Sequence, residues 1–276
     1  MPEASNKMPT IDEKRVYTDN TGTETVFVAS DAGVVAVSVS DDLVGGFGIA
    51  HRCHARDVAV GTETLAVATD EDVFCADLTT TDSADDLAFE ATEFGPATAV
   101  GFDGKTLLAG DEEGRVGRFD SEWTDLGRAE PVRAIDGPLV AAADGVHRVE
   151  ADSLAPVGLD NAYDVVGRDP LAATETGLYK LGNGWMDVLN GAFETVTADG
   201  DGRAHAVGGG HLFARSESGE WTPEPVPVAE GVAAVTYGPE ATYAVTTPGT
   251  FLVRLPGSEW RHQMLGLQGV TAAAVV

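Results

Sequence analysis

Short apolar runs separated by turn residues recur along the whole chain, and they come in groups. In each group a first run is followed by a tight turn, usually with glycine, and then by a second apolar run. Turn residues between two β-rich runs predict a hairpin. No comparable stretch has the 3.6-residue apolar period of an amphipathic helix. The first runs are TVFVAS from Thr25, TLAVAT from Thr64, TLLAGD from Thr106, PLVAAA from Pro138, PLAATE from Pro170, AHAVGG from Ala204 and TYAVTT from Thr242.

A third short apolar segment precedes six of these seven hairpins. The copy missing before the first hairpin is found at the other end of the chain, where GVTAAAVV (269–276) matches GVAAVTY (231–237). Nothing follows it that it could pair with. We therefore expect the C-terminal segment to supply the missing strand of the first repeat.

The repeat length and strand count predict the architecture. Successive copies lie about 36 residues apart, which suits a four-stranded propeller blade better than a helical hairpin. The sequence predicts an all-β, seven-bladed β-propeller of four-stranded blades, closed by the C-terminal strand joining the N-terminal blade. We expect residues 1–13 to be a flexible tail and residues 14–276 to form a single domain. A six-bladed ring is the alternative, with RVYT (15–18) as the first inner strand.

Tryptophan marks the start of four of the expected outer strands. We expect these indole rings to wedge adjacent blades together. A stacking platform for sugars or bases is the alternative. The four residues are Trp123, Trp185, Trp221 and Trp260.

The composition is strongly acidic, with 45 Asp and Glu against 17 Lys and Arg and a formal net charge of −28. Scattered cations argue against nucleic-acid binding. The balance is typical of cytoplasmic proteins adapted to molar salt, and an acidic surface evolved for a basic partner is the alternative. The N-terminus lacks an apolar segment and no run approaches a membrane span, so we expect a cytoplasmic protein without a membrane partner. We expect both cysteines to be free thiols.

The hairpin pattern A-[ST]-[DE]-x-G followed by an apolar run resembles the blades of WD40/YVTN-like and quinoprotein-like propellers. As a whole the chain is similar to a haloarchaeal β-propeller family within that broad group, over about residues 14–276. The resemblance implies an architecture and carries no activity or site residues.

Turns between the second and third strands place acids at nearly the same point in five blades, with a histidine near that point in a sixth. In propellers these turns share a face with the connections that enter the inner strands, where binding usually occurs. One reading is an Asx-type turn in which the acid accepts backbone N–H groups and a following glycine takes positive φ. The other is a ring of carboxylates at the channel mouth for a cation or a basic peptide. The residues are Asp31, Asp70, Asp111, Asp144, Glu175 and His211.

The densest group of soft metal ligands is His51-Arg52-Cys53-His54, on a connection expected on the same face. We expect this segment to be a polar surface loop. The alternative is a site for a divalent metal, with Asp57 or a turn acid completing it. No second His or Cys pair closes a structural zinc tetrahedron. No other cofactor is expected.

No nucleophile, zinc-protease or phosphate-loop motif occurs in the chain. We therefore expect a non-catalytic protein-interaction scaffold whose partner is another protein. The alternative is a metal-dependent hydrolase or a small-ligand site at the mouth of the central channel. The sequence leaves open whether the protein is an enzyme.

Overall fold

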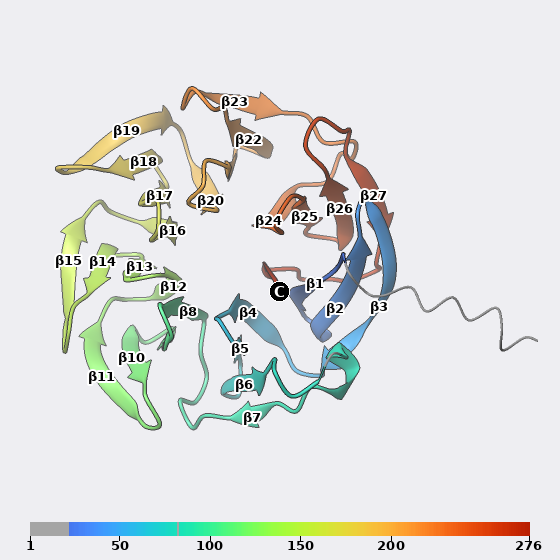
Figure 1. Ribbon diagram of the computed structural model, residues 1–276. Coiled ribbons are helices and arrows are strands. Elements are labelled where there is room, and N and C mark those ends of the chain that lie inside the picture. Colours follow the sequence, from blue (N-terminus) through green and yellow to red (C-terminus); the bar gives the residue numbers. More distant parts are fainter. Residues whose placement is uncertain (1–21, 82) are drawn as a thin grey trace, which may run out of the picture.

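Seven four-stranded antiparallel sheets radiate from a central axis in the computed structural model, which describes residues 22–81 and 83–276 (Figure 1). Each sheet is one blade, numbered here from the blade that contains β1. The seven-bladed prediction is confirmed, and the six-bladed alternative is wrong. The expected 1–13 tail and the 15–18 alternative strand lie outside the described residues.

The innermost strands line the axis and are short, with small or polar side chains facing inward. In blades 1 to 7 they are β28 (Ala272–Val275), β4 (Ala55–Val60), β8 (Ala99–Asp103), β12 (Val132–Asp136), β16 (Ala162–Val166), β20 (Phe193–Ala198) and β24 (Val232–Tyr237).

The second strands are buried along nearly their whole length because the neighbouring blades cover both faces. They are β1 (Thr23–Ser30), β5 (Thr64–Thr69), β9 (Thr106–Gly110), β13 (Leu139–Ala142), β17 (Leu171–Thr174), β21 (Ala204–Gly208) and β25 (Thr242–Thr246).

The third strands add polar residues toward their outer ends, where burial falls. They are β2 (Gly33–Ser40), β6 (Val73–Asp77), β10 (Arg115–Phe119), β14 (Gly145–Val149), β18 (Gly177–Leu181), β22 (His211–Arg215) and β26 (Thr250–Arg254).

The outermost strands vary most in length, and in blade 2 a short 3-10 turn, η2 (Ala84–Asp86), precedes the outer strand. They are β3 (Leu43–His51), β7 (Glu90–Ala91), β11 (Trp123–Arg128), β15 (Leu154–Gly158), β19 (Trp185–Asn190), β23 (Trp221–Glu224) and β27 (Arg261–Met264).

The C-terminal strand closes the ring, as the sequence predicts. β28 pairs antiparallel with β1 from Val26↔Val275 to Ala29↔Ala272 and so forms the inner strand of blade 1. It also packs between β24 and β4. Closure pairs the inner edge of β1, which would otherwise be left open at this junction.

Apolar contacts between blades form the core. Seven clusters of buried side chains each join two adjacent blades, so that the core itself is a ring. The four tryptophans lie in these junctions, half-buried against the preceding blade. The indole N–H of Trp123 donates to Thr92 O at 2.9 Å, and that of Trp185 donates to Val157 O at 3.0 Å. This geometry fits the expected wedge.

A polar contact reinforces the closing junction between blades 7 and 1. The Tyr243 hydroxyl donates to Glu24 Oε2 at 2.7 Å. A Cβ at Gly238 would lie 1.7 Å from that same oxygen, so only glycine leaves room for the carboxylate.

We predict that Gly238→Ala destabilises the protein by about 1 kcal/mol, because the added methyl group displaces the Glu24 carboxylate from its hydrogen bond with Tyr243. Urea unfolding followed by tryptophan fluorescence measures the change. Gly231→Ala is the matched control, since a Cβ there meets no atom within 4 Å. Equal stability of the two variants would contradict the tight fit.

Candidate functional site

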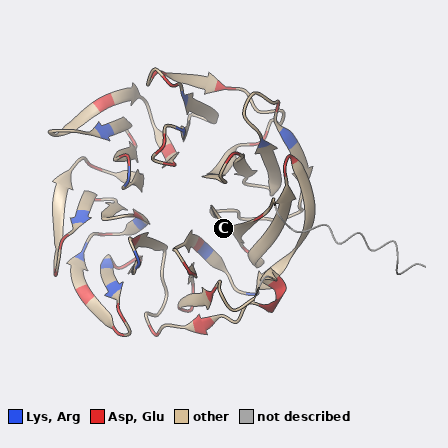
Figure 2. Cartoon of the chain, viewed as in Figure 1, with Lys and Arg blue, Asp and Glu red and all other residues tan. Residues whose placement is uncertain are grey.

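The mouth face is the face of the disc where the inner strands begin; it carries the turns between second and third strands. All six residues predicted for the channel mouth lie on these turns or at their ends. Acidic side chains occur in every blade, and the few cations are dispersed among them (Figure 2). The six residues thus lie on turns of one face, and their role in binding stays a prediction.

Most of the turn acids bond to side chains rather than to the backbone of their own turn. His54 Nε2–H donates to Asp31 at 3.1 Å, and His147 Nε2–H donates to Asp144 at 3.0 Å. Asn161 Nδ2–H donates to Glu175 at 2.7 Å. These contacts hold the carboxylates at separate points around the face.

Asp111 is the one turn acid that fits the Asx-type expectation, because its carboxylate accepts the backbone N–H of Arg115 at 2.8 Å. In other blades the residue before the acid stabilises the turn. Thr69 Oγ1 accepts the N–H groups of Glu71 and Asp72, and Thr174 Oγ1 accepts that of Gly177. The Asx interpretation is therefore wrong for these turns, since a hydroxyl one position earlier reaches the same N–H groups.

Asp70 and Asp111 come together in a hollow of about 570 Å³ between blades 2 and 3, which Arg56 and Arg115 also line. Asp70 is exposed, whereas Asp111 pairs with Arg115 Nε at 3.1 Å. The guanidinium of Arg115 in turn stacks on the Phe94 ring, 3.8 Å from its centroid. Asp111 is thus held in an ion pair, whereas Asp70 has no hydrogen bond or ion pair from its side chain to any residue that the structure describes.

The candidate metal ligands on the first connection do not converge. His51 ends β3 and stacks on Phe89, with ring centroids 4.5 Å apart, whereas His54 bonds to Asp31. Cys53 packs beside the core between blades 1 and 2, and burial raises the pKa of its thiol to about 11. Among the described residues, no three His, Cys, Asp or Glu side chains are arranged to hold a metal ion.

His211, the remaining predicted residue, is exposed at the start of β22. Both cysteines are free thiols, and Cys75 lies in β6. Within the described ranges, no helix has the length and apolar character needed to cross a membrane.

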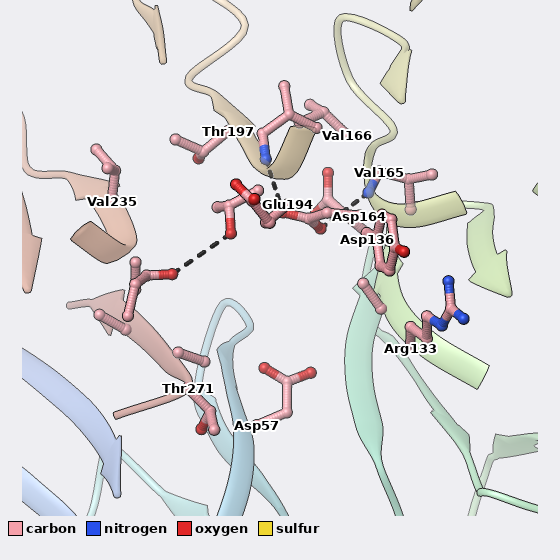
Figure 3. A pocket seen from close by; sticks show the side chains of 18 of the residues that line it. Asp57, Arg133, Asp136, Asp164, Val165, Val166, Glu194, Thr197, Val235 and Thr271 are labelled. Atoms are coloured by element: carbon pink, nitrogen blue, oxygen red, sulfur yellow. Dashed lines mark hydrogen bonds between the residues drawn. The ribbon is translucent and has the colours of Figure 1, made fainter. Parts of the chain in front are cut away.

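The central channel holds one cavity of about 430 Å³ lined by four carboxyl groups, those of Asp57, Asp136, Asp164 and the exposed Glu194 (Figure 3). Asp57 accepts the N–H of Val58 at 2.8 Å and that of Val100, in the next blade, at 2.9 Å. Asp164 repeats this arrangement, accepting from Val165 and from Val196 of the next blade, both at 2.8 Å. Each carboxyl group therefore links two inner strands.

Enclosure by the inner strands changes the ionisation of these groups. Burial raises the pKa of Asp57 to about 7 and that of Asp164 to about 8, although the backbone N–H groups oppose the shift. Burial also raises the pKa of Asp136, the third carboxyl group. Near neutral pH the channel therefore holds fewer negative charges than its residues suggest.

Arginine and tyrosine complete the polar part of the channel wall. Arg133 lies over the Tyr163 ring at 4.5 Å and donates to Asn161 Oδ1 at 2.6 Å. Because Asn161 also donates to Glu175, one hydrogen-bonded chain links the channel wall to a mouth-face turn. Alanines of β24 and β28 line the opposite wall. The carboxyl groups thus come from blades 2, 4, 5 and 6, and the alanines from blades 7 and 1.

We predict that stability falls as pH rises from about 4 to 8, and that Asp164→Asn makes the fall shallower. A raised pKa means that the folded state keeps a proton that the unfolded chain has lost. The stabilisation is therefore complete below the ordinary Asp value of 3.8 and is lost as pH rises through about 8. Thermal unfolding across this range measures it. Asp201→Asn, at an exposed turn, is the control, and parallel curves for wild type and Asp164→Asn would contradict the prediction.

A buried polar network joins blades 6 and 7, and no sequence motif points to it. His205 Nδ1 lies 2.7 Å from Tyr237 Oη, and its Nε2 lies 3.3 Å from Glu224 Oε2. The other oxygen of Glu224 accepts from Trp260 Nε1 and Arg254, both at 2.6 Å. The partners of His205 are 19 and 32 residues away in sequence. Predicting these contacts requires knowing how the strands of blades 6 and 7 are aligned.

Comparison with solved structures shows the same fold at low sequence identity. A nidogen/laminin complex chain is 10% identical with a TM-score of 0.58, and the match covers 91% of this chain and 98% of that one. The β-propeller domain of Myceliophteria thermophila Cps50 (Swd1) is 12% identical with a TM-score of 0.63, covering 80% and 89%. The WD40 propeller of Doa1 is 14% identical with a TM-score of 0.60, covering 76% and 82%. These matches establish the fold alone.

Comparison by sequence gives one family match. A search of curated proteins gave no match. Residues 10–276 match the family described as HVO_0234-like, beta propeller, which agrees with the haloarchaeal propeller resemblance. The chain therefore belongs to the HVO_0234-like β-propeller family.

Proposed function

We propose that this protein is a non-catalytic interaction scaffold that binds a protein partner on its mouth face. The observation that carries the proposal is the hollow between blades 2 and 3, which is lined by the exposed carboxylates of Asp70, Glu112 and Glu113 from two turns. Three arginines also line it, but Arg115 is paired with Asp111 and Arg128 donates to the Glu113 carbonyl, which leaves Arg56 beside the exposed acids. Thr69 fixes the turn that carries Asp70 through its hydroxyl hydrogen bonds. Pre-organised acids favour a partner with a basic segment, since little ordering is needed on binding.

Quantitative affinity capture tests the proposal. Wild type and an Asp70→Arg/Glu112→Arg variant serve as baits in native extract. The charge-matched control is Glu217→Arg/Glu259→Arg, which changes two exposed turns of blades 6 and 7. We expect a defined partner to be recovered by wild type and control, and to be depleted at least tenfold on the mouth-face variant. Equal recovery on all three baits, or no reproducible partner, would reject it.

The channel supports a second candidate, a small polar ligand held without catalysis. Its cavity of about 430 Å³ falls within the size range of small-molecule sites and is lined by carboxyl groups from blades 2, 4, 5 and 6. A thermal-shift screen of polar metabolites tests it, with Asp57→Asn/Asp164→Asn as the comparison. A ligand that stabilises wild type but not the variant supports this candidate, and the absence of such a ligand counts against it.

We also propose that the protein works in the cytoplasm of a cell with molar internal salt. The excess of 45 acidic over 17 basic residues, spread over all blades, supports this (Figure 2). Repulsion among exposed acids is screened over about 3 Å at 1 M salt and over about 10 Å at 0.1 M. We expect the unfolding temperature to rise between these concentrations of KCl, and an unchanged temperature would contradict the proposal.

A further inference from the structure

Blade 2 has the shortest outer strand of the seven. β7 spans only Glu90–Ala91, whereas the other outer strands have four to nine residues. The chain before β7 leaves the blade and packs on blade 1, where η2 contacts β3 and the Phe89 ring stacks on His51. The outer part of blade 2 is therefore incomplete next to blade 3.

A cleft of about 680 Å³ lies where that strand is short, between blades 2 and 3. It lies on the face opposite the mouth, because its lining includes Glu63 and Lys105, from the turns between first and second strands. This cleft is separate from the hollow on the mouth face. It shares no lining residue with that hollow or with the channel cavity.

The floor of the cleft is apolar and partly aromatic. Phe102, Leu107 and Phe119 of blade 3 line it, with Cys75 and Ala91 of blade 2 on the facing side. Phe102 and Phe119 are only half-buried. A space bounded by two phenylalanine rings and a leucine fits one large apolar side chain.

The rim of the cleft is acidic. Glu63, Asp77 and Glu90 are exposed around it, against the single cation Lys105. Asp77 is held by Thr79, whose N–H and hydroxyl donate to it at 2.7 and 2.6 Å, and these bonds lower the pKa of Asp77. Neither Glu63 nor Glu90 forms a side-chain hydrogen bond or ion pair with another described residue. Both carboxylates are therefore available to form an ion pair with a cation of a partner.

We propose that this cleft is a second docking site, which binds an extended segment of a partner protein through one large apolar side chain flanked by lysine or arginine. The apolar side chain occupies the floor formed by Phe102, Leu107 and Phe119. The flanking cations pair with Glu63 and Glu90 on the rim. Binding at this site is independent of the mouth-face proposal, because the two surfaces lie on opposite faces of the disc.

Peptide selection tests the site directly. The bait is the full-length protein, the probe is a displayed library of random seven-residue peptides, and Glu63→Lys/Glu90→Lys serves as the second bait. We expect wild type to enrich peptides with one large apolar residue next to Lys or Arg, and the variant to lose that enrichment. No enriched motif, or the same motif on both baits, overturns the proposal.

Two further variants localise the binding. Ala91→Trp fills the cleft from β7, an exposed position, and is expected to weaken the binding of an enriched synthetic peptide at least tenfold by fluorescence anisotropy. Glu217→Lys/Glu259→Lys, distant from the cleft, is expected to bind as wild type does. Unweakened binding to Ala91→Trp, or equal loss on the distant variant, would overturn the assignment to this cleft. Thermal unfolding of each variant confirms that it is folded.

Discussion

Deletion of residues 270–276 is expected to abolish cooperative folding. The deletion removes β28 and its pairing with β1, and it also removes the buried side chains of Val270 and Ala274. It exposes the β1 edge together with the apolar contacts of blades 7, 1 and 2. Burying one large apolar side chain contributes about 1.5–3 kcal/mol. The loss of several such contacts therefore approaches the total stability of a domain, about 5–15 kcal/mol.

Chemical unfolding followed by tryptophan fluorescence and far-UV circular dichroism measures the effect. Removal of Val276 alone is the control, because this residue is half exposed and follows β28. A circular permutant that carries residues 269–276 in front of Gly22 through a flexible linker should fold, since the strand then returns to the same place. A deletion variant that unfolds cooperatively with wild-type stability would show that the ring does not depend on this strand.

The architecture could be predicted because each blade repeats a local signal. Two β-rich runs around a glycine turn define a hairpin without any knowledge of distant residues, and Gly33, Gly114 and Gly145 do take positive φ at such turns. The closing strand followed from counting, since the first hairpin lacked the segment that precedes every other one. The hairpins use information contained within one repeat of about 40 residues, whereas the closing strand required comparing the repeats along the whole chain.

The three residues considered as metal ligands do not converge, and the reason is the local backbone geometry. His51, Cys53 and His54 are close in sequence but lie where a strand ends and a connection begins, so their side chains leave the backbone in different directions. His51 packs against two aromatic rings, Cys53 packs against the apolar core, and His54 bonds to a carboxylate. Spacing alone does not determine these directions.

The sequence carries a weak indication of two of the channel carboxyl groups. Asp57 and Asp164 occupy the same register position, opposite Ala68 and Ala173, each just after a β-bulge in the inner strand. Aligning the inner strands by this bulge would have placed both residues in the channel. Asp136 lies further along its strand, beside the turn to β13, and no repeat position marks it.

Glu224→Ala is expected to destabilise the protein by about 3–5 kcal/mol, the usual effect of removing one partner of a buried ion pair. The carboxylate is nearly buried and bonds simultaneously to His205, Arg254 and Trp260. Without it, the arginine loses its counter-ion and two ring N–H donors lose their acceptor. Blades 6 and 7 should separate first. Glu220→Ala, an exposed acid in the turn before β23, is the control and should change stability by less than about 0.5 kcal/mol.

The same carboxylate makes the junction sensitive to acid. Burial alone would raise the pKa of Glu224, but the hydrogen bond and charge of His205, with Arg254 and Trp260, bring it below the ordinary 4.5. A lowered pKa gives stabilisation that is complete above the unfolded value and is lost as pH falls through the folded value. Wild type should therefore lose stability below about pH 5, and Glu224→Gln, which cannot ionise, should lose less over the same interval. Guanidinium unfolding at a series of pH values compares them, and equal slopes would show that the carboxylate does not couple this junction to pH.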